Sequence, residues 1–281
     1  MTQSTWLPSP DWPNLSSALS ALPRGATAGV SVRSLTSSTT FAFNGETIFP
    51  AASTIKTLIL VALARSVDLG QVSLDDVAAA GPATNVAGSG VLNWLSNGLH
   101  LSLRDHAWLM IAISDNSASN VLVDAVGVEA IAAARQSLGL VSTSLNRRFL
   151  GRLPDLGQPE NLATPADLTT LLAAIWRDEA ASPESCAWMR SVLADQKYHD
   201  RIPRNLPASV SYAGKTGSLS GICHDCGVIS GPGGTAAVAV LTRGFDDEYG
   251  AEAFIGSVAL ATATDLRIAG DESHPPGRTR A

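Results

Sequence analysis

Strand patterns occur only near the two ends of this chain, and the long section between them is helical in pattern. Residues 27–32 and 39–43 read as strands before that section, and 210–217, 226–230 and 235–241 read as strands after it. Segments from both ends must pair in one sheet if the chain forms a single domain. The sequence therefore predicts an α/β fold of the α+β type, in which one sheet packs against a helical lobe.

Helical spacing of apolar residues predicts a short helix near the N-terminus, a long central helix, several further helices in the middle and a final helix. The central helix begins at Ala52, ends at Gly70 and is apolar nearly all round, so we expect it to be buried. The other predictions are helices at 11–22, 103–113, 118–126 and 249–266, with helix starts at Thr164 and Ser182.

The 281 residues suit one domain with two lobes. We expect the sheet lobe to comprise about 1–50 and 195–270, the helical lobe to comprise about 51–194, and the tail 271–281 to be disordered. A cleft between two lobes is a common place for a small ligand, so we expect the site there.

Composition narrows the classes of partner. The net charge of −6 argues against nucleic acid, which requires clustered cations. The N-terminus lacks a basic start followed by an apolar run, and the apolar stretch 58–64 is too short to cross a bilayer. We therefore expect a soluble cytoplasmic monomer or simple homodimer acting on a small molecule, or a secreted one if a leader has been removed.

Ser53 and Lys56 form a Ser-x-x-Lys pair at the start of the central helix. Residues three apart share a helix face, so the hydroxyl and the amine can lie within hydrogen-bond reach. A serine becomes nucleophilic when a base takes its proton, and a neutral amine can be that base. The apolar neighbours of Lys56 favour its neutral form. The pair indicates an active-site serine, although taken alone such pairs more often arise by chance.

Ser114-Asp115-Asn116 lies between two predicted helices, where all three residue types are common caps. An ordinary helix junction is one interpretation. In the functional interpretation, Ser114 relays a proton and the Asn116 amide bonds a substrate amide or carbonyl.

Lys215-Thr216-Gly217 ends a predicted strand. Lys215 offers a cation and Thr216 a hydroxyl to a substrate carboxylate, while Gly217 lets the backbone approach a ligand closely. A strand end with a solvated lysine is the structural alternative.

Together the motifs follow the order Ser-x-x-Lys, Ser-Asp-Asn, Lys-Thr-Gly, which is the set found in class A β-lactamases and penicillin-binding proteins. The sequence resembles the class A β-lactamase-like serine hydrolases over about residues 25–265. The likeness extends to four stretches, residues 49–52, 86–92, 109–116 and 215–218. The resemblance implies a five-stranded antiparallel sheet flanked by N- and C-terminal helices, an all-helical lobe and no cofactor.

The resemblance also implies roles for the motif residues. Ser53 would attack an acyl carbonyl, Lys56 would act as general base, and Ser114 would pass the proton to the leaving group. The substrate would be oriented by the remaining motif residues and the oxyanion held by two backbone N–H groups: Asn116, Lys215, Thr216 and Gly217 for orientation, and Ser53 and Ser218 for the oxyanion.

The loop after the Ser-Asp-Asn motif departs from the family pattern. Class A β-lactamases have a glutamate there that positions the deacylating water, and alignment places Phe149 at that position. Asp155 and Glu160 are the only carboxylates in the loop 148–163. The resemblance therefore implies a complete acylation site without the usual base for hydrolysing the acyl-enzyme.

Three functions remain open at this stage. The first is a hydrolase of a β-lactam, a D-alanyl amide or a small ester. The second is an acyltransferase of small-molecule biosynthesis that passes the acyl group to an amine or alcohol. The third, a non-catalytic binding protein, fits least well because the motif side chains are all present.

Cys223-His224-Asp225-Cys226 resembles half of a metal site, but no second pair of ligands is nearby. Consecutive strand residues also point to opposite faces. We expect no metal here, and either a local disulfide or free thiols.

Overall fold

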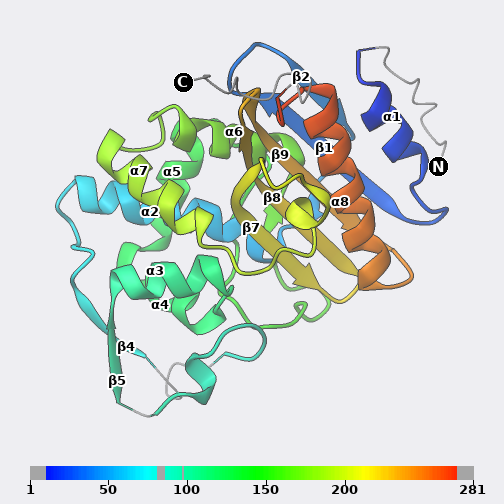
Figure 1. The fold of residues 1–281 in the computed structure, drawn as a ribbon. Helices are drawn as coiled ribbons and strands as arrows, with labels where there is room; N and C mark the ends of the chain where they lie inside the picture. Colours follow the sequence, from blue (N-terminus) through cyan, green and yellow to red (C-terminus); the bar gives the residue numbers. More distant parts are fainter. Residues whose placement is uncertain (1–10, 81–85, 97, 271–281) are drawn as a thin grey trace, which may run out of the picture.

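The computed structural model describes residues 11–80, 86–96 and 98–270, and it has a sheet lobe and a helical lobe (Figure 1). The main sheet has five antiparallel strands in the order β2-β1-β9-β8-β7, so the two ends of the chain meet where β1 pairs with β9. This confirms the predicted fold class. Two smaller sheets pair β3 with β6 and β4 with β5.

The elements have the following bounds. The helices are α1 (Pro13–Ser20), α2 (Lys56–Asp68), α3 (Leu103–Ala112), α4 (Asn116–Val126), α5 (Val128–Ser137), α6 (Pro165–Trp176), α7 (Pro183–Ala194) and α8 (Glu248–Asp265). The strands are β1 (Thr27–Ser34), β2 (Thr40–Phe43), β3 (Phe49–Pro50), β4 (Val77–Ala80), β5 (Leu99–Ser102), β6 (Leu162–Ala163), β7 (Ser211–Leu219), β8 (Ile222–Gly231) and β9 (Gly234–Arg243). Short 3₁₀ turns are η1 (Ala52–Ile55), η3 (Leu92–Trp94) and η4 (Ile202–Asn205).

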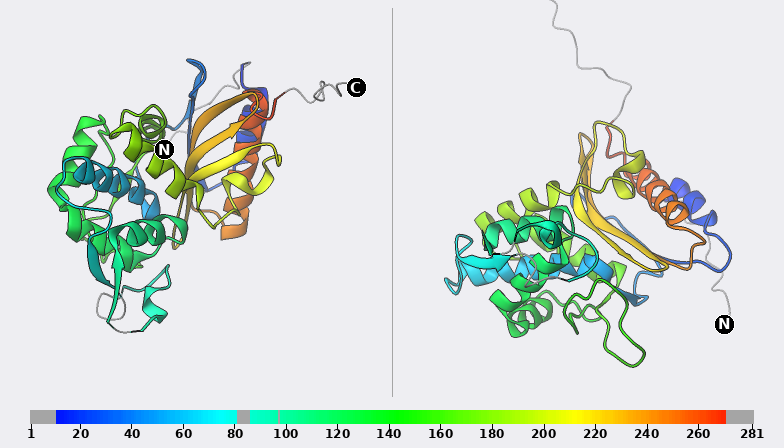
Figure 2. Two further views of the ribbon diagram at one scale, coloured as in Figure 1. Left: turned by 60° about the vertical axis from the view of Figure 1, so that its left-hand side comes forward. Right: turned by 90° about the horizontal axis from the view of Figure 1, so that it is seen from below.

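The main sheet lies between two hydrophobic cores. Along β9, Val238 and Val240 belong to the core under α1 and α8, while Ala239 and Leu241 belong to the core of the helical lobe. This alternation follows from the period of two in a strand. Figure 2 shows α1 and α8 on one face of the sheet and the helical lobe on the other. The sheet is thus covered on both faces.

Helix α2 lies at the centre of the helical lobe and is buried over most of its length, as its apolar sequence predicts. Its first turn differs from the prediction. The sequence places the helix start at Ala52, whereas η1 forms there and α2 begins at Lys56. Ala52 has a positive φ of 47°, a conformation that a continuous helix does not allow. Ser53 therefore sits on a tight turn ahead of the helix.

Strand β8 begins at Ile222, four residues before the predicted start, so the Cys-His-Asp-Cys segment pairs with both β7 and β9. Cys223 belongs to the core under α8 and Cys226 to the core of the helical lobe, so the two thiols face opposite sides of the sheet. Both are free and buried. Within the described ranges, no group of three or more His, Cys, Asp or Glu side chains is arranged to hold a metal ion.

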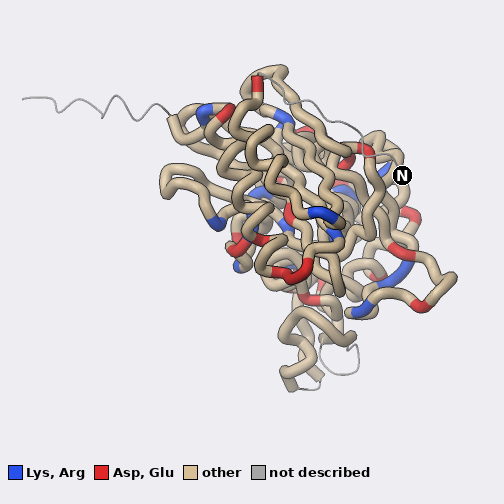
Figure 3. Tube along the Cα trace, turned by 90° about the vertical axis from the view of Figure 1, so that its right-hand side faces the viewer, with Lys and Arg blue, Asp and Glu red and all other residues tan. Residues whose placement is uncertain are grey.

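Charges are interspersed along the chain trace in Figure 3. Among the residues that the structure describes, no single helix is long and apolar enough to cross a bilayer. The pair α4 and α5, bent by 85°, passes that test of length and composition only when taken together. The predicted tail 271–281 lies outside the described residues.

Candidate active site

Ser53 lies where the edge strand β7 meets the beginning of α2. A Cβ atom added to Gly217 would lie 3.1 Å from the Ser53 backbone nitrogen, so glycine permits this close approach. Ser53 lines two adjoining cavities of about 60 and 250 Å³. The larger one also contains Ser114, Thr216 and Ser218. All three sequence motifs therefore reach one cleft.

The Lys56 amine is completely buried and makes three hydrogen bonds to the connection between α3 and α4. Its Nζ donates to the Ser114 carbonyl at 2.8 Å and to the Asn116 Oδ1 at 2.9 Å, and it lies 3.2 Å from the Ser114 Oγ. Among the hydrogen bonds of the described residues, none joins Lys56 to Ser53. The amine is thus held by the second motif, one helical turn from Ser53.

Burial lowers the pKa of the Lys56 amine well below its ordinary value, because a charged ammonium loses its hydration there. The positive charge of Lys215 lowers it further, and the Asp115 carboxylate acts in the opposite direction. A neutral amine has two N–H donors and a lone pair. The Ser114 hydroxyl at 3.2 Å is then placed to donate to that lone pair.

Ser114 itself has a positive φ of 59°, which is costly for a residue other than glycine. Asp115 holds the turn in place: it caps α4 by accepting from the Ala118 N–H at 2.9 Å. Its second oxygen accepts from the backbone N–H groups of Val91 and Leu92. The carboxylate therefore ties the Ser114 turn to the loop 86–92.

The same loop contacts Asn116. The Asn116 amide donates to the Ala87 carbonyl at 2.9 Å, while its oxygen accepts from Lys56. A Cβ added at Gly90 would lie 2.2 Å from the Asp115 carboxylate, so glycine is required there. Ser89, to which the sequence pattern assigns no role beyond its place in the stretch 86–92, lines both cavities beside Ser53.

Lys215 is also completely buried, and its Nζ donates to the Thr216 carbonyl at 2.8 Å. Burial lowers the pKa of this amine to about 7. The positive charge of Lys215 is therefore partial near neutral pH. Thr216 lines the larger cavity, whereas Lys215 is not among the residues that line it.

Arg201 is a cleft residue that none of the motifs contains. Its side chain is 94% buried, and it lines the larger cavity with Ser53. Nη1 donates to the carbonyls of Gly217 and His224, and Nη2 donates to the Ser218 Oγ at 2.6 Å and to Glu248 at 3.2 Å. Only the tertiary structure brings this arginine, from the segment before η4, to the end of β7.

Phe149 lies against the amine of Lys56, with the ring centroid 4.7 Å from Nζ. The Asn120 side chain fixes the Phe149 backbone by accepting from its N–H and donating to its carbonyl. The loop places a hydrocarbon ring, and not a carboxylate, beside Lys56.

The two loop carboxylates are held by arginines. Glu160 lines the smaller cavity but is ion-paired at 2.8 Å with Arg147, and both side chains are largely buried. Asp155 pairs with Arg152 on the surface and lines neither cavity. Of the two, only Glu160 shares a cavity with Ser53.

His224 connects the sheet to the segment ahead of Ser53. One ring nitrogen lies 2.9 Å from the Pro50 carbonyl, and the other accepts from the Thr242 N–H at 3.0 Å. This pattern assigns the proton to Nε2 in a neutral ring. Burial lowers the pKa of His224 to about 4. The histidine therefore anchors Pro50, three residues before Ser53, as a neutral group.

Comparisons with known proteins match this chain to one family and to solved structures of a similar fold. The model of the beta-lactamase enzyme family matches residues 14–266. The crystal structure of a beta-lactamase from Sphaerobacter thermophilus is 38% identical, with a TM-score of 0.88 over 91% of this chain and 98% of that one. A mutant of PBP-A, solved as an acyl-enzyme complex with penicillin G, is 28% identical, with a TM-score of 0.81 over 90% of this chain and 96% of that one.

A curated relative adds a different kind of protein. The beta-lactamase regulatory protein BlaB of Streptomyces cacaoi is 24% identical over 86% of this chain and 94% of its own length. The similar proteins thus include a beta-lactamase, a penicillin acyl-enzyme and a regulatory protein.

Proposed function

The chain belongs to the beta-lactamase enzyme family, and we propose that Ser53 is the nucleophile of an acyl-enzyme mechanism with Lys56 as its general base. The observation that carries the proposal is the buried Lys56 amine, which lies one helical turn from Ser53, a residue that lines the cleft. Burial and the charge of Lys215 lower the pKa of this amine. The substrate class is a β-lactam, a D-alanyl amide or a small ester.

The amine acts from one helical turn away. Neutral Nζ takes the proton of the Ser53 hydroxyl as Oγ attacks the acyl carbonyl, and for this step the hydroxyl turns towards the amine, because no hydrogen bond joins the two side chains among those of the described residues. The Ser114 hydroxyl, 3.2 Å from Nζ, passes a proton to the leaving group when the acyl bond breaks. The oxyanion lies between the backbone N–H groups of Ser53 and Ser218, which both border the cavities.

The acyl-enzyme then persists. Phe149 offers no lone pair to a water, and Glu160 is held by Arg147 in an ion pair. Water attack on the Ser53 ester is slow without a carboxylate to activate the water, because a general base positioned on the attacking water ordinarily contributes about 10²–10⁴ in rate. A second function, acyl transfer to an amine or alcohol, follows from the same observation, because a long-lived ester gives another nucleophile time to attack.

The test is a time course with a chromogenic cephalosporin and with an activated ester. We expect rapid release of about one equivalent of chromophore, followed by a slow phase that added amines accelerate. Ser53→Ala and Lys56→Ala remove the burst. A burst that survives in Ser53→Ala, or a linear fast hydrolysis in the wild type, contradicts the proposal.

A further inference from the structure

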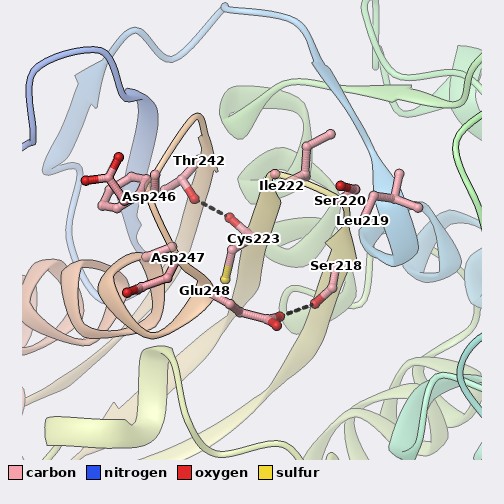
Figure 4. Close-up of a pocket in the computed structure, with 12 residues that line it drawn as sticks. Ser218, Leu219, Ser220, Ile222, Cys223, Thr242, Asp246, Asp247 and Glu248 are labelled. Atoms are coloured by element: carbon pink, nitrogen blue, oxygen red, sulfur yellow. Dashed lines mark hydrogen bonds between the residues drawn. The ribbon is translucent and has the colours of Figure 1, made fainter.

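The carboxylate of Glu248 binds two hydrogen-bond donors of the cleft, Ser218 and Arg201. Glu248, the first residue of α8, accepts from the Ser218 hydroxyl at 3.1 Å and from Arg201 Nη2 at 3.2 Å (Figure 4 shows the contact with Ser218). Ser218 and Arg201 line the same cavity as Ser53. The carboxylate of Glu248 thus occupies the donors that a substrate carboxylate would need.

The N–H groups on Nη1 and Nη2 of Arg201 are all engaged by the protein. A guanidinium carries five N–H donors. Four of those of Arg201 are engaged, two by the carbonyls of Gly217 and His224 and two by Ser218 and Glu248. The fifth, on Nε, has no hydrogen-bond partner within the described residues and points to the side of Asp200, whose Oδ1 lies 3.7 Å away.

The other charges of the cavity also disfavour an anion. Asp200 and Glu252 line it together with Glu248, and Arg201 is the only Lys or Arg among the described residues that line it. Burial and the neighbouring Asp200 carboxylate raise the pKa of Glu252, as expected where several carboxylates line one cavity. Lys215, which is buried next to the lining residue Thr216, has a pKa lowered to about 7 and is only partly charged near neutral pH.

Room for a leaving group lies on the far side of Glu248. A cavity of about 350 Å³ extends from Ser218 and Glu248 between the β7–β8 turn and the start of α8 (Figure 4). Its lining combines apolar side chains, among them Ile222 and Phe245, with the carboxylates of Asp246 and Asp247, and no Lys or Arg is among the described residues that line it. An apolar group that carries an amine suits such a lining better than one that carries a carboxylate.

We propose that Glu248 is a specificity-determining residue that disfavours carboxylate-bearing leaving groups, those of β-lactams and D-alanyl amides included, by about tenfold and favours substrates or acyl acceptors that carry an amine there. This rests on the proposed acyl-enzyme chemistry at Ser53. In the transfer step, the acceptor ammonium first gives up one proton to the solvent. Its neutral nitrogen then bonds to the acyl carbon, the bond to Ser53 Oγ breaks, and the second proton returns through Lys56 to Oγ.

The test uses three phenylacetylglycyl phenyl esters with meta-carboxyl, meta-carbamoyl or meta-aminomethyl groups on the leaving phenol. The ratio of the Glu248→Gln rate to the wild-type rate cancels the intrinsic reactivity of each ester. For acylation of Ser53, we expect this ratio to be about 10 for the carboxyl ester, the worth of one charged hydrogen bond. We expect the carbamoyl ester to stay within about twofold and the aminomethyl ester to slow.

Glu129→Gln is the matched control, because this glutamate also lies in the first turn of a helix, is exposed and lines none of the three cavities. A uniform ratio for all three esters, or the same selective change in Glu129→Gln, overturns the proposal. A second measurement is independent of acylation. In Ser53→Ala, Glu248→Gln should bind benzylpenicillin about tenfold more tightly and its methyl ester equally well. Unchanged binding of benzylpenicillin overturns the proposal about Glu248, whether or not an ester labels Ser53. A lack of labelling at Ser53 refutes the acyl-enzyme function instead.

Discussion

Lowering the pH should destabilise this protein through His224, the buried histidine that anchors the segment ahead of Ser53. Its pKa is about 4 in the folded chain against 6.5 without the fold, so the unfolded chain binds more protons between these values. The contribution to the free energy of unfolding is complete above about pH 6.5 and is lost as the pH falls towards about 4.

The size of the effect follows from the two pKa values. The full difference corresponds to about 3 kcal/mol, of which about 2 kcal/mol is lost by about pH 5. Protonation also places a proton on the ring nitrogen that accepts from the Thr242 N–H, and that hydrogen bond is broken. The charged ring still donates from Nε2 to the Pro50 carbonyl, so the lost stability reflects the cost of burying the imidazolium charge.

Urea denaturation at about pH 8 and pH 5 measures this loss. The His224→Gln variant is less stable than the wild type at the higher pH, but its stability changes by about 2 kcal/mol less between the two pH values. His100→Gln, at an exposed position of β5, controls for the removal of a histidine. An equal pH dependence in His224→Gln and the wild type would refute the reasoning.

Three further predictions concern the chemistry of the cleft. Phe149→Glu should speed loss of the acyl adduct by about 100-fold, because a carboxylate beside Lys56 can activate water, while Phe149→Leu should not; quenched time courses by mass spectrometry decide between these outcomes. The acylation rate should fall as the pH decreases through the lowered pKa of Lys56, and Lys215→Met should move this fall to higher pH, since it removes a cation that favours the neutral amine; a pH profile of the burst that does not move contradicts this. Gly217→Ala should slow acylation at least about tenfold and cost about 1–3 kcal/mol of stability, because the added methyl lies 3.1 Å from the Ser53 nitrogen; unchanged burst kinetics and melting temperature would show that the turn yields.

The fold class and the identity of the cleft residues follow from local patterns in the sequence. Strand patterns at both ends of the chain predict one sheet built from both ends, and the pairing of β1 with β9 confirms it. Ser53 and Ser114 lie in the turns before α2 and α4. The Lys-Thr-Gly triplet, which the sequence predicts at the end of a strand, lies inside β7, because this strand continues to Leu219 paired with β8. The fold brings these segments to one cleft. Their roles in catalysis stay predictions that the experiments above test.

Other features depend on contacts that sequence patterns do not carry. The turn at Ser53 departs from the predicted helix because Ala52 takes a positive φ beside β7. Strand β8 extends back to Ile222 because its neighbours β7 and β9 supply partners on both sides. Arg201 and Glu248 come from segments far apart in the chain, and the fold brings them into direct contact and onto Ser218. Neither has a motif that could have revealed it.

Mass spectrometry of the intact protein, mixed with the meta-carbamoylphenyl ester and followed by peptide mapping, tests most directly whether Ser53 forms an acyl-enzyme. We expect one phenylacetylglycyl group on the peptide that contains Ser53, persisting over many minutes in the wild type and missing in Ser53→Ala and Lys56→Ala. An adduct that forms equally in Ser53→Ala, or a wild-type protein that consumes the ester without ever carrying the acyl group, would contradict the mechanism.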